Sequence, residues 1–168
     1  MSQQTLILEY LSKLPLSYEL HHHAPVRTMD DCLSLPFITE DIVFCKNILL
    51  TTRQKDAFFL FLTLPHKPFR TAEVSKKLGT SRLSFAPSDL LPELLQLESG
   101  SLSPLALWLD KNHRIMLVLD RDIYAYPRLA LHPCDHTASV VLRMEDFRQV
   151  VVPSLKAIVT ELTLPVPS

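Results

Sequence analysis

The chain has 168 residues, of which 47% are hydrophobic and 21% charged, and its formal net charge is −1. This size and composition predict one domain, spanning residues 1–168, with a single buried core. A net charge near zero excludes a global field that would hold a long stretch of nucleic acid, so DNA is not an expected partner and any contact with nucleic acid should be local.

Glycine, cysteine and long apolar runs are all scarce. Two glycines beside 13 prolines leave no glycine-rich loop for a triphosphate or a dinucleotide. The three cysteines form no CxxC pair, which argues against a disulfide framework or a four-cysteine zinc site. No apolar stretch approaches the roughly 20 residues of a membrane span, and the N-terminus lacks the basic region of a secretory signal. We therefore expect a cytoplasmic protein without a membrane partner.

The first part of the chain alternates helical and extended patterns. Apolar residues three and four positions apart predict a helix over 5–14, and a short strand follows at 18–22. Thr28 and Asp31 form an N-terminal capping pattern for a further helix, which Pro36 ends.

The middle of the chain predicts a hairpin followed by two helices. The apolar run 42–50, a polar turn and the run 57–64 have the pattern of two paired strands. A helix over 71–78, capped by Thr71, should stop at Gly79. Another helix over 88–97 should begin near Leu90 or Leu91, because Pro92 fits only in a first turn.

The last part predicts more strands and a final helix. Four short apolar runs separated by turn residues suggest a meandering sheet: 105–109, 115–119, 128–131 and 138–142. A helix over 145–152, a closing strand over 155–162 and a loose tail at 163–168 complete the chain. Strands interrupted by helices predict an α+β fold in which helices cover a mixed or antiparallel sheet.

Lys46 and Asn47 interrupt the apolar run 42–50 and are the most informative residues of the sequence. If the run is a strand, Lys46 shares one face with Phe44 and Ile48, while Asn47 points to the other. An ammonium among apolar neighbours is costly unless an anion or water meets it, so this position indicates docking of a negatively charged group. The alternative is a solubilising lysine on an edge strand.

The segment that contains His132, Cys134 and His136 allows two further hypotheses. In an extended conformation these three side chains would project to one side, where they could hold zinc in a metal-dependent hydrolase. Cys134 could also act as a nucleophile beside a histidine. No fourth metal ligand can be named from the sequence, and nothing in it places an oxyanion donor beside Cys134, so we expect no metal and no cofactor.

Five segments in a fixed order resemble the YbaK/ProX family of aminoacyl-tRNA deacylases, and most of all the free-standing prolyl-tRNA editing proteins. The resemblance spans roughly residues 18–162, nearly the whole chain. The five segments are His23-Ala24-Pro25-Val26, Lys46-Asn47-Ile48-Leu49-Leu50, Leu78-Gly79-Thr80-Ser81-Arg82-Leu83-Ser84-Phe85, Gly100-Ser101-Leu102-Ser103-Pro104 and Leu131-His132-Pro133.

The resemblance implies a small α+β domain with a mixed, partly barrel-like sheet, and it implies a role for several residues. Lys46 would engage the phosphate of the terminal adenosine of tRNA, the loop from Gly100 would lie at the aminoacyl ester, and His132 would match the histidine of the family's HP motif. A small apolar pocket would select the amino acid. The residues expected to bind substrate are Val26, Leu33, Phe44, Asn47, Ile48, Arg82, Ser103, Pro104 and His136.

The implied reaction is hydrolysis, in trans, of the ester of mischarged tRNA(Pro), with alanine as the amino acid removed and with help from the ribose hydroxyl. The implied partners are the acceptor end of mischarged tRNA and prolyl-tRNA synthetase. Two alternatives stay open: an inactive tRNA-binding module of the same fold, and a deacylase for another small amino acid such as cysteine or serine. Related sequences carry an asparagine where this chain has His136, and a bulkier or amide residue where it has Cys134. These two differences would alter the pocket wall and so affect which amino acid is removed.

Overall fold

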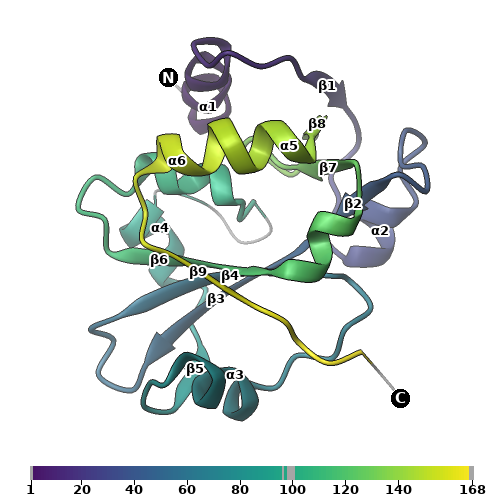
Figure 1. Ribbon diagram of the computed structural model, residues 1–168. Helices are drawn as coiled ribbons and strands as arrows, with labels where there is room; N and C mark the ends of the chain where they lie inside the picture. Colours follow the sequence, from purple (N-terminus) through teal and green to yellow (C-terminus); the bar gives the residue numbers. More distant parts are fainter. Residues whose placement is uncertain (1, 96, 98–100, 167–168) are drawn as a thin grey trace.

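The predicted hairpin forms the centre of the larger of two sheets (Figure 1). The computed structural model describes residues 2–95, 97 and 101–166. Strands β3 (Lys46–Thr52) and β4 (Phe58–Thr63) pair antiparallel, with Lys46 opposite Thr63. Strand β5 (Leu83–Phe85) joins β3 antiparallel. On the other side, β6 (Ile115–Asp120) and β9 (Val159–Leu162) add in parallel, which gives the order β5-β3-β4-β6-β9.

The smaller sheet has the order β1-β8-β7-β2. Its strands are β1 (Glu19–His22), β2 (Ile42–Phe44), β7 (Arg128–Leu131) and β8 (Ala138–Arg143). Strands β7 and β2 are parallel and the other pairs antiparallel. The prediction of one strand over 42–50 is wrong, because β2 and β3 separate at Cys45 and belong to different sheets. The apolar pattern runs through this break since both strand ends are buried or half-buried.

The helices begin and end close to their predicted positions. They are α1 (Gln3–Ser12), α2 (Met29–Leu33), α3 (Thr71–Leu78), α4 (Leu90–Leu95), and the helical segment formed by α5 (Met144–Asp146), a π-helical turn (Phe147–Val151) and α6 (Val152–Leu155). Gly79 ends α3 in the left-handed region, with φ of 68°, as predicted. The predicted cap at Thr71 is wrong, because Arg70 takes the N-cap position and Thr71 is the first helical residue.

Two predicted strands are wrong or too long. The run 105–109 lies in a 3-10 helix (Pro104–Leu109), because Ser103 accepts a hydrogen bond from the Leu105 amide and Pro104 starts the turn. A second 3-10 helix (Arg121–Ala125) follows β6. The predicted closing strand starts only at Val159, after Lys156 has ended α6 in the left-handed region. The strands therefore form two sheets and not one meander.

The larger sheet is buried on both faces, which explains the continuous apolar sequence of β4. Phe58, Leu60 and Leu62 belong to the main core, to which α1, the 3-10 helix Pro104–Leu109 and the segment 144–155 also contribute. Phe59 and Phe61 point to the opposite face, where Val74 of α3 covers them. The α+β prediction with a mixed sheet is thus confirmed. Among the described helices, none has the length and apolar character needed to cross a membrane.

The chain after β9 is docked on the larger sheet at Leu164. This side chain is 2% exposed and packs in the cluster on the α3 face. Its carbonyl accepts a hydrogen bond of 2.6 Å from the Lys67 ammonium. The prediction of a loose tail from residue 163 is therefore wrong for its first residues, whose apolar contacts lie far away in the sequence.

Candidate active-site pocket

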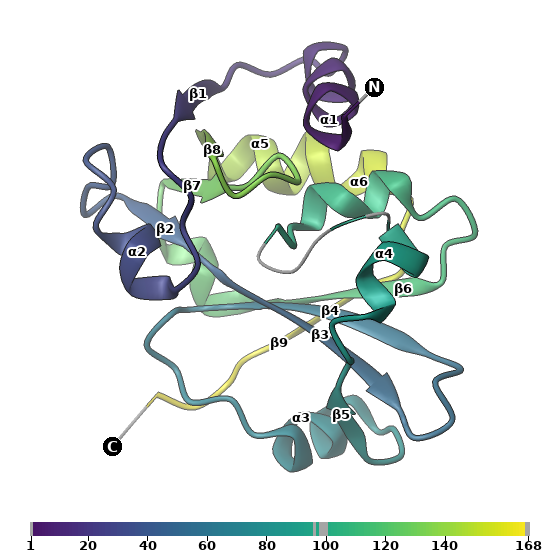
Figure 2. The ribbon, with the colours of Figure 1, turned by 180° about the vertical axis from the view of Figure 1, so that it is seen from behind.

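A pocket of about 410 Å³ opens beside the junction of β2 and β3. In the rear view, α2 and α4 lie on either side of these strands (Figure 2). The lining residues come from α2 and the three residues before it, from the strand junction, from the stretch between the end of β5 and the start of α4, and from two single positions: Val26, Arg27, Thr28, Met29, Cys32, Phe44, Cys45, Asn47, Ile48, Leu49, Phe85, Ala86, Ser88, Leu91, Leu102 and His132. A mostly apolar lining with a few polar groups is typical of a small-molecule site.

The predicted capping box holds the α2 wall of this pocket. The Asp31 amide donates to the Thr28 hydroxyl at 3.1 Å, and the Asp31 carboxylate accepts from the Thr28 amide at 3.3 Å. This pins the first turn of α2, from which Met29 and Cys32 reach the pocket. Leu33 was expected on the wall, but it is 44% exposed and does not line the pocket. On a helix, adjacent residues point about 100° apart, so Cys32 takes the inward position.

His132 lies in the pocket wall with a defined arrangement of its ring. Its Nδ1 is 3.0 Å from the Ala138 carbonyl oxygen. A carbonyl can only accept, so Nδ1 carries the proton and Nε2 is an acceptor. The Cys32 thiol approaches Nε2 with a sulfur–nitrogen distance of 3.9 Å. The ring is 6% exposed and lies 5.1 Å, between centroids, from Phe44.

Burial sets the protonation of both groups. Burial lowers the pKa of His132 below its ordinary value, and the nearby His23 and His136 lower it further, against the effect of the Ala138 hydrogen bond. The neutral ring is therefore favoured. Burial, together with the charge of Asp31, raises the pKa of the Cys32 thiol to about 11, so this thiol stays protonated and can donate to Nε2. The pocket thus holds a neutral histidine that accepts hydrogen bonds.

Asn47 contributes a second acceptor. Its Nδ2 donates to the Cys45 carbonyl at 3.3 Å. Its Oδ1 is buried and has no hydrogen-bond partner within the described part of the chain. A buried polar atom of this kind is costly unless a ligand or water meets it. Three further predicted residues, Val26, Phe44 and Ile48, also line the pocket.

Lys46 lies on the other face of β3. It pairs in register with Thr63, and its half-buried ammonium donates to the Lys67 carbonyl at 2.6 Å. Lys46 does not line the pocket, although its neighbours Cys45 and Asn47 do. The positively charged side chain that does line the pocket is the exposed Arg27, which the sequence did not indicate.

The predicted loop contributes Leu102 to the pocket. Gly100 lies outside the described residues. Ser103 is buried and uses its hydroxyl to cap the following 3-10 helix, which begins at Pro104, and neither residue lines the pocket. The loop nevertheless reaches the predicted histidine segment, because the Ser101 hydroxyl lies 3.4 Å from Nδ1 of His136.

The two remaining predicted residues are outside the lining. His136 is half-buried, and its carbonyl accepts from the Val26 amide at 3.1 Å, which joins its turn to the pocket wall. Arg82 is exposed between α3 and β5. Phe85 and Ala86, just after it, do line the pocket. These two residues and Met29 and Cys32 of α2 were not predicted from the sequence. The only sequence signal related to them was the capping box, which indicates where α2 begins.

The geometry does not assemble the metal or thiol sites considered from the sequence. Across the residues that the structure describes, no three side chains of histidine, cysteine, aspartate or glutamate gather as metal ligands. Burial raises the pKa of the Cys134 thiol to about 12, so the nucleophilic thiolate is disfavoured. The pocket instead combines apolar walls with neutral acceptors.

Comparison with known proteins agrees with this site. Residues 23–150 match the family described as the aminoacyl-tRNA editing domain, a range that includes all the residues that line the pocket. The chain belongs to this family, whose activity is hydrolysis of the ester that joins an amino acid to tRNA. The resemblance found in the sequence is thereby confirmed.

Individual relatives cover most of the chain. A protein of Acetoanaerobium sticklandii named prolyl-tRNA editing protein ProX is 27% identical over 90% of this chain and 92% of its own length. A Danio rerio protein named prolyl-tRNA synthetase associated domain-containing protein 1 is 28% identical over 82% of this chain and 75% of its own length. A crystal structure, described as that of a proposed trans-editing enzyme for prolyl-tRNA synthetase, has the same fold, with a TM-score of 0.68 and 14% identity over 98% of this chain and 99% of its own.

Proposed function

We propose that the protein hydrolyses, in trans, the ester of mischarged tRNA(Pro) and that alanine is the amino acid removed. The observation that carries this proposal is the pocket, in which apolar walls enclose the neutral acceptors His132 and Asn47. The names of the relatives support the choice of tRNA, because they refer to prolyl-tRNA editing and to prolyl-tRNA synthetase. The partners in this proposal are the acceptor end of the tRNA and, by the second name, that synthetase.

Selection of alanine would follow from the size of the pocket. Binding distinguishes one methylene group by only about 1–3 kcal/mol, so a synthetase that mistakes alanine for proline benefits from a second site that excludes the larger correct product. Val26, Phe44 and Ile48 form apolar walls suited to a methyl side chain. In this proposal the walls would hold the ester so close that the larger proline ring does not fit beside it.

The chemistry requires little beyond orientation. An aminoacyl ester is already activated, so the site has to hold the ester, orient a water molecule and stabilise the oxyanion that develops. Nε2 of His132 would accept a hydrogen bond from that water or from the neighbouring ribose hydroxyl in place of its long, 3.9 Å contact with the Cys32 thiol. Lys46 uses one of its three N–H donors on the Lys67 carbonyl, and the others would bind the phosphate of the terminal adenosine.

The test is a panel of tRNAs charged with alanine, proline, serine or cysteine, incubated with the purified protein. We expect fast release of alanine from tRNA(Pro) and little release of proline. Equal release of alanine and proline would refute size selection. Tight binding of the charged tRNA without release of amino acid would identify a binding module instead of an enzyme.

Two variants with matched controls test the site itself. The loss of one charged contact in Lys46→Ala should lower kcat/KM for Ala-tRNA(Pro) about 10- to 100-fold, and His132→Ala should lower kcat. Lys13→Ala and His66→Ala change the same residue types at exposed positions away from the pocket and should keep full activity. Full activity in Lys46→Ala would exclude the phosphate contact.

A further inference from the structure

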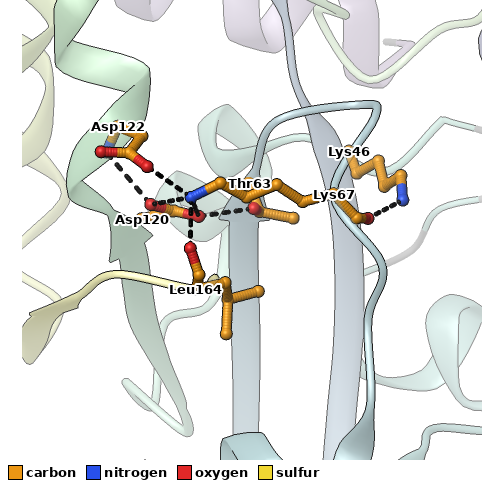
Figure 3. A network of polar contacts seen from close by, with 6 residues as sticks. All are labelled: Lys46, Thr63, Lys67, Asp120, Asp122 and Leu164. Carbon is orange, nitrogen blue, oxygen red and sulfur yellow. Dashed lines mark hydrogen bonds and ion pairs between the residues drawn. The ribbon is translucent and has the colours of Figure 1, made fainter. Parts of the chain in front are cut away.

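Lys67 is a fully buried lysine in the connection between β4 and α3, and its ammonium is completely paired (Figure 3). Its Nζ donates to Asp120 at 2.9 Å, to Asp122 at 2.6 Å and to the Leu164 carbonyl at 2.6 Å. An ammonium has three N–H donors, so these partners use all of them.

The acceptor side is satisfied as well. The Asp120 carboxylate, which is also fully buried, accepts from the Thr63 hydroxyl at 2.7 Å and from the Asp122 amide at 3.0 Å. Burial lowers the pKa of Lys67, but the hydrogen bonds and charges of Asp122 and Asp120 outweigh it and raise the pKa above its ordinary value. The ammonium therefore stays charged through the physiological range.

Stability alone does not explain why a buried ion pair occupies this position. Taking both charges out of water costs several kcal/mol per ion, and apolar residues of similar volume often stabilise a fold as well or better. What the ion pair provides is a fixed position. It joins the end of β6, the end of β4 and the segment after β9 to one residue of the β4–α3 connection.

The backbone of that same residue holds Lys46. The carbonyl oxygen of Lys67 accepts the 2.6 Å hydrogen bond from the Lys46 ammonium, and the Lys67 amide donates to the Leu64 carbonyl at 3.2 Å. Figure 3 shows the two ends of Lys67: its ammonium faces the carboxylates of Asp120 and Asp122, and its carbonyl faces the Lys46 ammonium. One residue thus carries both the buried ion pair and the acceptor for Lys46.

We propose that Lys67 is a positioning residue that acts through Lys46: its buried ammonium, held by Asp120, Asp122 and the Leu164 carbonyl, fixes the carbonyl that orients the Lys46 amine. The inference rests on the proposed function, since it assigns the purpose of this arrangement to binding of a tRNA phosphate by Lys46. A freely rotating lysine loses rotamer entropy when it is ordered, and a lysine that is already oriented loses less on binding.

The first test is a double-mutant cycle on kcat/KM for Ala-tRNA(Pro). Asp122→Asn weakens the hold on Lys67 at its most accessible partner, whose side chain is 44% exposed, so the fold should survive. We expect a loss of about 2- to 10-fold with Lys46 present, comparable to one hydrogen bond, and no further loss in the Lys46→Ala background. A loss of equal size in both backgrounds would show a purely structural role and overturn the proposal. Asp146→Asn, which breaks the separate ion pair with Arg143, should have no effect in either background.

The second test needs no tRNA. Acetic anhydride modifies lysine amines, and mass spectrometry gives the rate at each position. Asp122→Asn should raise the rate at Lys46 several-fold, because the amine loses its fixed acceptor, while the rate at the exposed Lys13 stays unchanged. An unchanged rate at Lys46 would overturn the positioning role. If the unmodified protein releases no amino acid from any charged tRNA, the proposed function fails, and this measurement still decides whether Lys67 orients Lys46.

Discussion

His132 owes its chemical character to its surroundings more than to its identity. The ring donates from Nδ1 to Ala138 and is buried against Phe44, so it stays neutral and presents Nε2 as an acceptor. The HP pair indicated in the sequence that this histidine matters. It could not indicate the tautomer, because the partner carbonyl is placed by the pairing of β7 with β8.

The lowered pKa of His132 predicts that stability falls when the solution is acidified. The folded protein takes up the His132 proton at a lower pH than the unfolded chain, whose ordinary pKa is 6.5, so around and below that pH the unfolded state binds more protons. The free energy of unfolding should therefore drop from pH 7 to pH 5, and less so in His132→Gln. Urea unfolding at the two pH values measures this difference. His66→Gln, at an exposed site, should keep the pH dependence of the original protein, and an equal drop in His132→Gln would contradict the burial argument.

Some residues predicted for the site line the pocket and others do not, and their roles stay predictions. Asn47 and His132 line the pocket as expected, whereas Lys46 and Leu33 do not. The Lys67 ion pair had no local signal at all, because Lys67 and Asp120 are 53 positions apart. Burial of a charge depends on partners that the fold supplies, and no sequence pattern around Lys67 shows them.

At the scale of elements, α2 connects a local sequence signal to the pocket. Its capping box was predicted correctly, because the residues involved lie three positions apart. The break between β2 and β3 and the 3-10 helix at 104–109 were not, because their apolar residues contact different layers of the fold and no period in the sequence records that.

The cap of α2 should therefore matter for stability and for substrate binding together. Thr28→Ala removes the acceptor of the Asp31 amide and should cost about 1 kcal/mol of unfolding free energy. It should also raise KM for Ala-tRNA(Pro), because Met29 and Cys32 line the pocket from this helix. Ser2→Ala removes the equivalent cap of α1, away from the pocket, and should destabilise similarly with KM unchanged. Equal KM values in the two variants would show that α2 does not contribute to substrate binding. Thr28→Ser keeps the hydroxyl acceptor and should restore both the free energy of unfolding and KM.

At the scale of the whole molecule, the two sheets meet where the chain passes from β2 into β3, and the pocket lies at that junction. An α+β fold was predictable from the alternation of helical and extended segments, but the division into two sheets was not. Parallel pairs such as β4 with β6 and β6 with β9 join segments that are distant in the sequence. No local pattern in the sequence shows which of these strands are neighbours in the sheet.

The segment after β9 shows how far this long-range assembly extends, and it yields a prediction about the whole fold. Leu164 is buried against the α3 face of the larger sheet, so Leu164→Ala should lower the free energy of unfolding by about 2–4 kcal/mol. Val166, two residues further and 60% exposed, should tolerate alanine with a change below about 0.5 kcal/mol. Urea unfolding of both variants measures the contrast. A loose tail would make the two substitutions equally harmless, whereas a docked one makes Leu164 part of the core that holds the Lys67 ion pair in place.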